Sequence, residues 1–108
     1  MQKVIFYRKA REIIQGFPED VRYELGQALT LLQGGLALGL PLSRPMPSIG
    51  RNVAELRLRG RAGIFRVFYA VGRRAGVLVF HAFVKKTDKT SALELQLAAR
   101  RLEDLEDE

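Results

Sequence analysis

The sequence predicts an α+β fold in which a small antiparallel β-sheet carries two N-terminal helices and a C-terminal helix. Two observations carry this prediction. The stretch from Val53 to Lys86 reads as three strands joined by short turns, because apolar and basic residues alternate with period two along the first two and the third ends in a pair of lysines. On either side of this stretch, apolar residues recur at the spacing of an amphipathic helix. The predicted order of elements is β-α-α-β-β-β-α.

The first elements are a strand and two helices. Lys3–Tyr7 (KVIFY) is a β-branched and aromatic run typical of a strand, and Arg8–Gln15 continues with helical spacing. Pro18 suits the first turn of the second helix, and Gly34 ends that helix. The apolar stripe of the second helix consists of Val21, Leu25, Ala28, Leu29 and Leu32.

A long loop and three strands follow. Residues 36–52, rich in Pro, Gly and Ser, predict an irregular connection. In the next strand Leu56 and Leu58 point to one face, and Arg57 and Arg59 point to the other. The same alternation separates Phe65, Val67, Tyr69 and Val71 from Ile64, Arg66, Phe68 and Ala70. We therefore expect an exposed sheet face that displays arginines.

The C-terminal segment predicts a helix with a ragged end. Ser91 suits the N-cap position, and Glu94 completes an S-x-x-E capping box. Leu93, Leu97, Ala98 and Leu102 form the apolar face of this helix. Residues 103–108 hold five acids and are expected to fray. We thus expect one domain, residues 1–102, and an acidic tail, residues 103–108.

Composition narrows the classes of function. The chain has 108 residues, no cysteine and one histidine, so neither a disulfide framework nor a thiolate or histidine-built metal site is expected. It shows neither a signal peptide nor a run of apolar residues long enough to span a bilayer, so we expect a cytosolic protein. The net charge is +6, and Arg51 to Lys89 holds ten basic residues against two acidic ones. Such a field favours nucleic acid, and the alternative is a solvated basic face.

Three segments in a fixed order carry a family resemblance. "AELR", "FRVFY" and "FVKKT", set between helices, resemble the RelE/ParE superfamily of type II toxins, most closely its HigB-like, phage-derived branch. The resemblance covers essentially the whole chain and implies the small toxin fold. RelE- and HigB-type members cleave mRNA, usually on the ribosome, and are inhibited by a cognate antitoxin, which for HigB-like members is commonly a helix-turn-helix protein. ParE-type members instead poison DNA gyrase.

Several basic residues match positions of the family. Arg57 and Arg59 fall where its nucleases place basic residues on the strand before the hairpin, and Arg66 matches the arginine of the next strand. Lys85 and Lys86 match the basic pair at the end of the last strand. Some RelE-type enzymes also carry a catalytic tyrosine in the terminal helix, and this chain departs from them because its C-terminal helix has no tyrosine.

These residues define the predicted site. Arginine keeps its proton, so it is expected to hold phosphate oxygens as charge develops, whereas Lys86 or His81 could move a proton. We predict a catalytic set of Arg57, Arg66, Lys86 and His81, an RNA-binding set of Arg59, Lys85, Arg61 and Lys89, and neither a metal nor a cofactor.

Each assignment has an alternative. Arg66 would otherwise form an ion pair with Glu55 or with the acidic tail, and Arg61 would be a turn charge. His81, taken to be in phase with Val77, Val79 and Phe83, would be a half-buried structural residue. Tyr69 belongs to the core by its position, although its hydroxyl could reach the site.

The resulting functional prediction is the toxin of a type II toxin–antitoxin system, a metal-independent endoribonuclease that cleaves translated mRNA. We expect its antitoxin to cover the basic face or to displace the terminal helix. Two alternatives remain open: a ParE-like gyrase inhibitor, and a non-catalytic phage-derived RNA-binding regulatory domain.

Overall fold

The predicted α+β class and the order of the elements are confirmed. The computed structural model describes residues 1–85 and 90–107. Its elements are β1 (Val4–Phe6), α1 (Arg8–Gln15), α2 (Glu19–Gln33), β2 (Ser43–Pro45), β3 (Val53–Gly60), β4 (Gly63–Arg73), β5 (Gly76–Lys85) and α3 (Ala92–Glu106). In this described part of the chain, no helix has both the length and the apolar character needed to cross a membrane.

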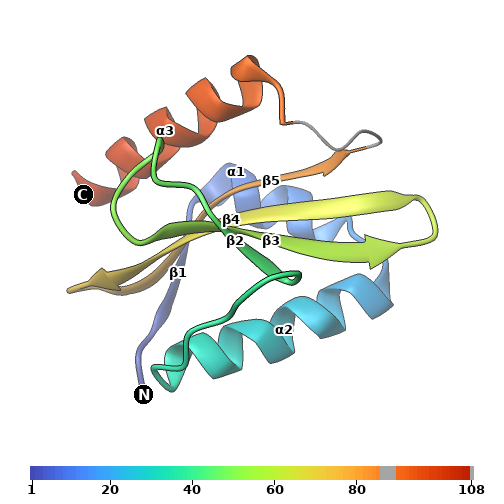
Figure 1. The fold of residues 1–108 in the computed structure, drawn as a ribbon, viewed down its shortest axis with the longest axis horizontal. Coiled ribbons are helices and arrows are strands. Elements are labelled where there is room, and N and C mark those ends of the chain that lie inside the picture. Colours follow the sequence, from blue (N-terminus) through green and yellow to red (C-terminus); the bar gives the residue numbers. More distant parts are fainter. Residues whose placement is uncertain (86–89, 108) are drawn as a thin grey trace.

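The strands form one mixed sheet between helices. Its order is β1-β5-β4-β3-β2, and all neighbours are antiparallel except β1, which runs parallel to β5. Gly76, with a φ of 130°, leaves room for the Lys3 carbonyl at the start of this parallel pair. Helix α2 lies on one face of the sheet and α3 on the other, while α1 packs against β5 (Figure 1).

Each face of the sheet carries its own hydrophobic core. On the α2 face the buried side chains include Leu25, Leu29, Leu56, Leu58, Phe65 and Val67. On the α3 face they include Val53, Phe68, Ala70, Phe80, Ala98 and Leu102. The division of β3 and β4 side chains predicted from the period-two alternation is therefore confirmed. Burial of these apolar groups from both sides is the main force that holds the three layers together.

A β-bulge in β5 changes the phase of its side chains. Phe68 pairs with His81, but the next residue, Tyr69, pairs with Val79, so Phe80 is an extra residue in the ladder. As a result Val79 packs on the α2 face, whereas Phe80 and His81 both face α3. The prediction that His81 is in phase with Val79 was wrong because strict alternation does not allow for the bulge.

Strand β2 lies inside the segment that was predicted to be an irregular loop. Its three residues, Ser43–Pro45, pair with Ala54–Leu56 at the edge of the sheet. Pro45 has no backbone N–H to donate to a neighbouring strand. The N–H of Ser43 donates instead to the carbonyl of Gly39, in the preceding loop. A strand this short, ending in proline, shows no alternation from which it could be recognised.

Helix α3 continues well past Leu102. It runs to Glu106, and Asp107 is its C-cap, so the expectation of a frayed acidic tail is wrong for residues 103–107, while Glu108 lies outside the described residues. Leu105 lies one turn beyond Leu102 and is also buried against the sheet. Arg73 donates from Nε to Glu106 at 2.7 Å and ties the end of the helix to β4. The acidic residues are therefore the solvent side of an amphipathic turn.

The burial of Leu105 predicts that the last turn of α3 stabilises the fold. Leu105→Ala should lower the free energy of unfolding by about 2–4 kcal/mol, because it removes a packed side chain. Leu93→Ala, in the same helix but 73% exposed, should cost less than about 0.5 kcal/mol. Urea unfolding followed by circular dichroism measures both, and equal costs would show that this turn does not pack.

Candidate functional site

The arginines of β3 and β4 face each other on the α3 side of the sheet. Arg57 lies directly opposite Arg66 in the antiparallel register. Like charges in such a position repel and destabilise a sheet unless a counter-charge lies between them. That counter-charge comes from Glu55, two residues before Arg57 on the same face.

Glu55 is a buried carboxylate bound from three sides. Its Oε1 accepts a hydrogen bond of 2.6 Å from Nη1 of Arg66, and Nε of Arg57 lies 3.9 Å from the same oxygen. Its Oε2 accepts a hydrogen bond of 3.1 Å from the hydroxyl of Thr90. The side chain is 1% exposed, so this carboxylate depends on its charged partners for stability.

The two arginines differ sharply in their access to solvent. The side chain of Arg66 is 0% exposed, whereas that of Arg57 is 25% exposed. The expectation of an exposed row of arginines is therefore wrong for Arg66, because the sheet face around it is covered and its charge is balanced inside the protein. Its alternative, an ion pair with Glu55, is confirmed. Arg57 is the arginine of this pair that a phosphate can reach from solvent.

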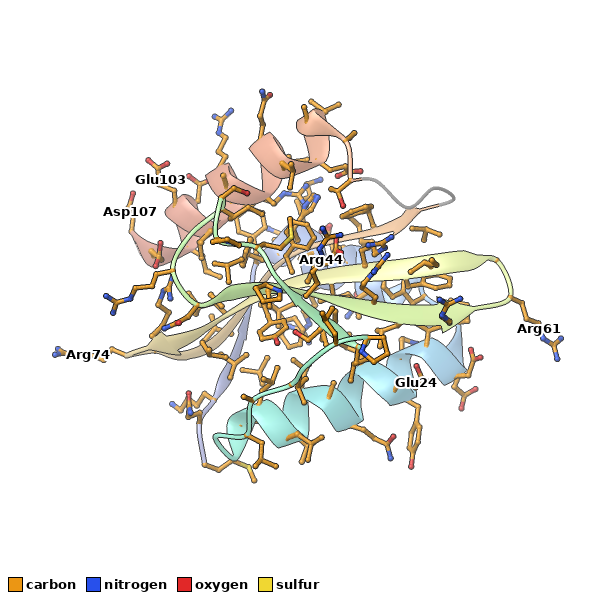
Figure 2. The ribbon with its side chains drawn as sticks, in the orientation of Figure 1. Glu24, Arg44, Arg61, Arg74, Glu103 and Asp107 are labelled. Atoms are coloured by element: carbon orange, nitrogen blue, oxygen red, sulfur yellow. The ribbon has the colours of Figure 1, made fainter. Side chains whose placement is uncertain are left out.

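Glu55 lies at the floor of a cleft, which we call the Thr90 cleft. The cleft has a volume of about 390 Å³ and is lined by Arg44, Pro45, Met46, Pro47, Ser48, Glu55, Thr90 and Leu95. Arg44 belongs to β2 and pairs in register with Glu55, so the edge strand adds an exposed cation to the rim (Figure 2). The cleft thus combines a buried carboxylate, the hydroxyls of Ser48 and Thr90, and an arginine, Arg44, while Arg57 lies beside it through its contact with Glu55.

His81 holds α3 against the sheet. Its Nδ1 lies 2.9 Å from Nη1 of Arg101, and its Nε2 lies 2.7 Å from Oε1 of Glu94. Because arginine can only donate, Nδ1 accepts, and Nε2 carries the proton and donates it to Glu94. Burial lowers the pKa of His81, the hydrogen bond with Glu94 raises it, and the charge of Arg101 lowers it, with a net lowering. His81 is thus a neutral connector, 2% exposed.

The remaining predicted residues spread over the β3–β4 hairpin and the end of β5. Arg59 is exposed on β3, and Arg61 points into solvent from the turn (Figure 2). Lys85 ends β5 opposite Ile64. Lys86 and Lys89 lie outside the described residues, so their assignments stay predictions. Of the predicted catalytic residues, the structure brings together Arg57 and Arg66. Glu55, which was the alternative partner of Arg66, lies between them.

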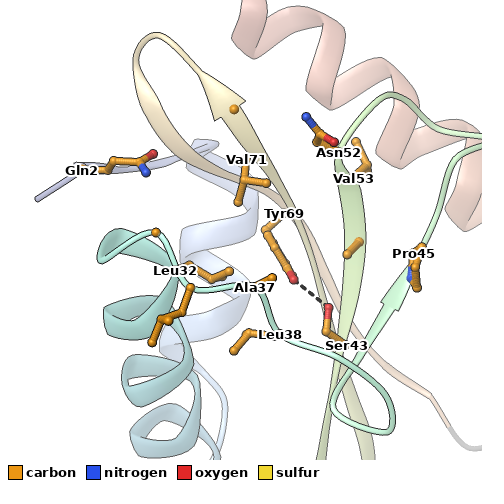
Figure 3. Close-up of a pocket in the computed structure, with 14 residues that line it drawn as sticks. Gln2, Leu32, Ala37, Leu38, Ser43, Pro45, Asn52, Val53, Tyr69 and Val71 are labelled. Carbon is orange, nitrogen blue, oxygen red and sulfur yellow. Dashed lines mark hydrogen bonds between the residues drawn. The ribbon is translucent and has the colours of Figure 1, made fainter.

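A second cavity lies on the opposite face of the sheet. It has a volume of about 420 Å³ and lies between the end of α2 and strands β3 and β4 (Figure 3). Tyr69 reaches it and shares a hydrogen bond of 2.6 Å with Ser43, so its hydroxyl does not reach the arginines. No charged side chain is among those that line it. It therefore lacks the groups that would bind a phosphate.

Sequence reasoning missed the residues that close the site from other elements. Arg44 was hidden in the apparent loop, Thr90 precedes α3, and Arg101 lies on α3 outside the predicted set. Only the period of α3, which places Glu94 and Arg101 two turns apart on one side, could have indicated a shared partner. Within residues 1–85 and 90–107, no three or more His, Cys, Asp or Glu side chains form a group that could hold a metal ion.

A family model matches most of the chain. The model of a family described as "Phage derived protein Gp49-like (DUF891)" matches residues 12–103. A search of curated proteins found no significant match. The matched range extends from α1 into the last turns of α3 and includes every strand of the sheet except β1.

The buried pair predicts a stability difference between two arginines. Arg66→Ala should lower the free energy of unfolding by about 3–5 kcal/mol, because Glu55 would lose its closest cation inside the protein. Arg59→Ala, two residues along the chain from Arg57 but exposed, should change it by less than about 0.5 kcal/mol. Unfolding by urea measures both. An Arg66→Ala protein as stable as wild type would mean that Glu55 does not need this partner.

The lowered pKa of His81 predicts a pH-dependent stability. In the unfolded chain histidine takes up a proton near pH 6.5, whereas in the folded chain it does so only at lower pH. His81 therefore makes its full contribution to the free energy of unfolding above about pH 6.5. This contribution is lost as the pH falls toward the pKa that His81 has in the folded chain. Between about pH 7.5 and pH 5.5, wild type should lose more unfolding free energy than His81→Gln, which cannot titrate. Parallel curves for the two proteins would contradict this.

Proposed function

We propose that this chain, which belongs to the phage-derived Gp49-like family, is the toxin of a type II toxin–antitoxin pair and cleaves translated mRNA. The family is associated with RelE-like toxins, and this supports a toxin-like role. Cleavage of RNA is the finer part of the proposal and rests on the chemistry of the Thr90 cleft. The proposed partner is a cognate antitoxin, of the helix-turn-helix type by the resemblance.

The observation that carries the proposal is the difference between Arg57 and Arg66. Arg66 forms a close, buried ion pair with Glu55. The ion pair between Glu55 and Arg57 is longer, 3.9 Å. Arg57 therefore keeps a partly exposed guanidinium beside a fixed carboxylate. A guanidinium can bind two phosphate oxygens at once and is well suited to the extra charge that builds up on phosphorus during cleavage.

Cleavage without a metal needs a group that accepts the proton of the ribose 2′-hydroxyl. Within the described lining of the Thr90 cleft, Glu55 is the carboxylate in position to do so. Its Oε2 already accepts a hydrogen bond from a hydroxyl, that of Thr90, at 3.1 Å. We infer that a ribose hydroxyl replaces Thr90 when RNA binds, and that Glu55 then acts as general base.

The reaction is a transfer within the RNA backbone. Glu55 takes the proton of the 2′-hydroxyl, the 2′-oxygen bonds to phosphorus, and the bond from phosphorus to the 5′-oxygen breaks. The leaving oxygen takes a proton from solvent, so the products are a 2′,3′-cyclic phosphate and a 5′-hydroxyl. Arg57 stabilises the charge on the phosphorane, and Arg66 positions Glu55.

This proposal predicts a large effect of Arg57 on cleavage. Arg57→Ala should reduce RNA cleavage by about 10²–10³-fold, because an oriented donor to the developing charge is lost. Arg57→Lys should also be strongly impaired, because an ammonium cannot form the two-pronged contact. Arg74→Ala, which removes an exposed cation at the far hairpin, should cleave like wild type (Figure 2). Primer extension on RNA from induced cells, with circular dichroism of each purified variant, provides the readout.

Other outcomes point to other functions. A folded Arg57→Ala protein that still cleaves mRNA at full rate would contradict the assignment of Arg57 to the cleavage site. Growth arrest without RNA cleavage, together with loss of gyrase supercoiling activity, would identify a ParE-like inhibitor instead. Binding of RNA with neither effect would identify a regulatory domain.

A further inference from the structure

We propose that a pocket next to Arg57 binds a guanine base of the RNA substrate. This pocket, called here the Glu24 pocket, has a volume of about 270 Å³ and is lined by Glu24, Pro41, Leu42, Arg57, Arg59 and Ile64. The inference rests on the proposed function and adds the recognition of one base to it.

The pocket exists because β2 is shorter than the strand it pairs with. The N–H of Arg57 donates to the carbonyl of Leu42, the residue just before β2, whereas β3 continues to Gly60. Backbone groups of alternate residues point to the same edge of a strand, so the N–H and C=O of Arg59 point outward like those of Arg57. Neither forms a backbone hydrogen bond with the part of the chain that the structure describes. A base can therefore pair with this open strand edge.

Glu24 supplies a carboxylate without a partner in the described structure. It is an exposed residue of α2, on the side of the helix below the β3–β4 hairpin (Figure 2). No ion pair or hydrogen bond joins its side chain to any residue within 1–85 and 90–107. It lines the pocket together with Arg57 and Arg59 and remains available to a ligand.

The remaining walls suit a flat ring. Pro41, Leu42 and Ile64 offer apolar surface, and arginine side chains can stack on a base. A volume of about 270 Å³ is just below the range typical of drug-sized ligands, which fits a single base rather than a larger group. Arg57 lines this pocket and also contacts Glu55, so a base held here would place its own phosphate near the proposed reaction centre.

The polar groups select guanine among the four bases. A carboxylate accepts two hydrogen bonds side by side, and guanine presents the matching pair of neighbouring donors, N1–H and the 2-amino group. Guanine O6 is an acceptor beside these donors, suited to the free N–H of Arg59 or to a guanidinium. Adenine and cytosine present an amino group next to an acceptor, which the carboxylate would repel, and uracil offers only one donor.

The test measures binding separately from cleavage. The probe is a short fluorescent 2′-fluoro oligouridylate, which lacks the attacking hydroxyl, with one central position occupied by guanosine, inosine, adenosine or cytidine. Fluorescence anisotropy with the purified chain should show guanosine bound about 5- to 100-fold more tightly than adenosine or cytidine. Inosine, which keeps N1–H but lacks the amino group, should fall between them.

A matched pair of variants assigns the preference to the pocket. Glu24→Gln should bring the affinities for guanosine and adenosine to within about twofold of each other, because a neutral amide cannot accept both donors. Glu19→Gln removes the same charge from the same helix outside the pocket and should keep the wild-type preference. Circular dichroism checks that both variants fold.

The outcomes separate this inference from the proposed function. Equal binding of all four probes by wild type, or a guanosine preference that survives Glu24→Gln, overturns the guanine pocket. Cleavage of natural RNA without base preference would also contradict the guanine pocket, but it would support the proposed nuclease function. A guanosine preference that depends on Glu24 in a protein that cleaves no RNA would support the pocket and contradict the nuclease.

Discussion

A single buried carboxylate has to balance two arginines that oppose each other on neighbouring strands. Arg57 and Arg66 share one face of the sheet, and without Glu55 their charges would repel under a layer of apolar side chains. Glu55 binds Arg66 closely and Arg57 loosely. This unequal sharing divides the basic face into a closed, charge-balanced centre and an open cationic rim, and it is the rim that can meet an anion.

The elements around this centre follow from the need to cover it. Helix α3 lies over the same face and is tied down by polar contacts, with His81 bridging Glu94 and Arg101, while Arg101 also lies over the ring of Tyr7 at 5.4 Å. On the other side the short strand β2 adds Arg44 to the rim and then ends. Because β2 is short, Arg57 lines the Glu24 pocket and at the same time contacts Glu55, which lines the Thr90 cleft.

Period-two alternation was enough to predict β3 and β4 and which of their side chains share a face. It could not predict coverage, because Arg66 and Arg57 have the same pattern in the sequence and differ only in how deeply the fold buries them. His81 was misplaced because an extra residue in β5 breaks the alternation, and β2 was too short to show any. The acidic end of α3 looked like a solvated tail because its charges outnumber Leu105, yet that leucine repeats the helical spacing of Leu102 and packs.

The parallel pairing of β1 with β5 has a consequence for how the chain reaches its native state. Val4–Phe6 is held by Val77–Val79, residues that follow it by most of the length of the chain. Closing so long a loop costs entropy before any contact repays it, so this edge of the sheet raises the contact order and slows folding. During synthesis the first strand leaves the ribosome well before its partner exists. The parallel pair that closes this edge of the sheet can therefore form only after the segment through Val79 has been synthesised.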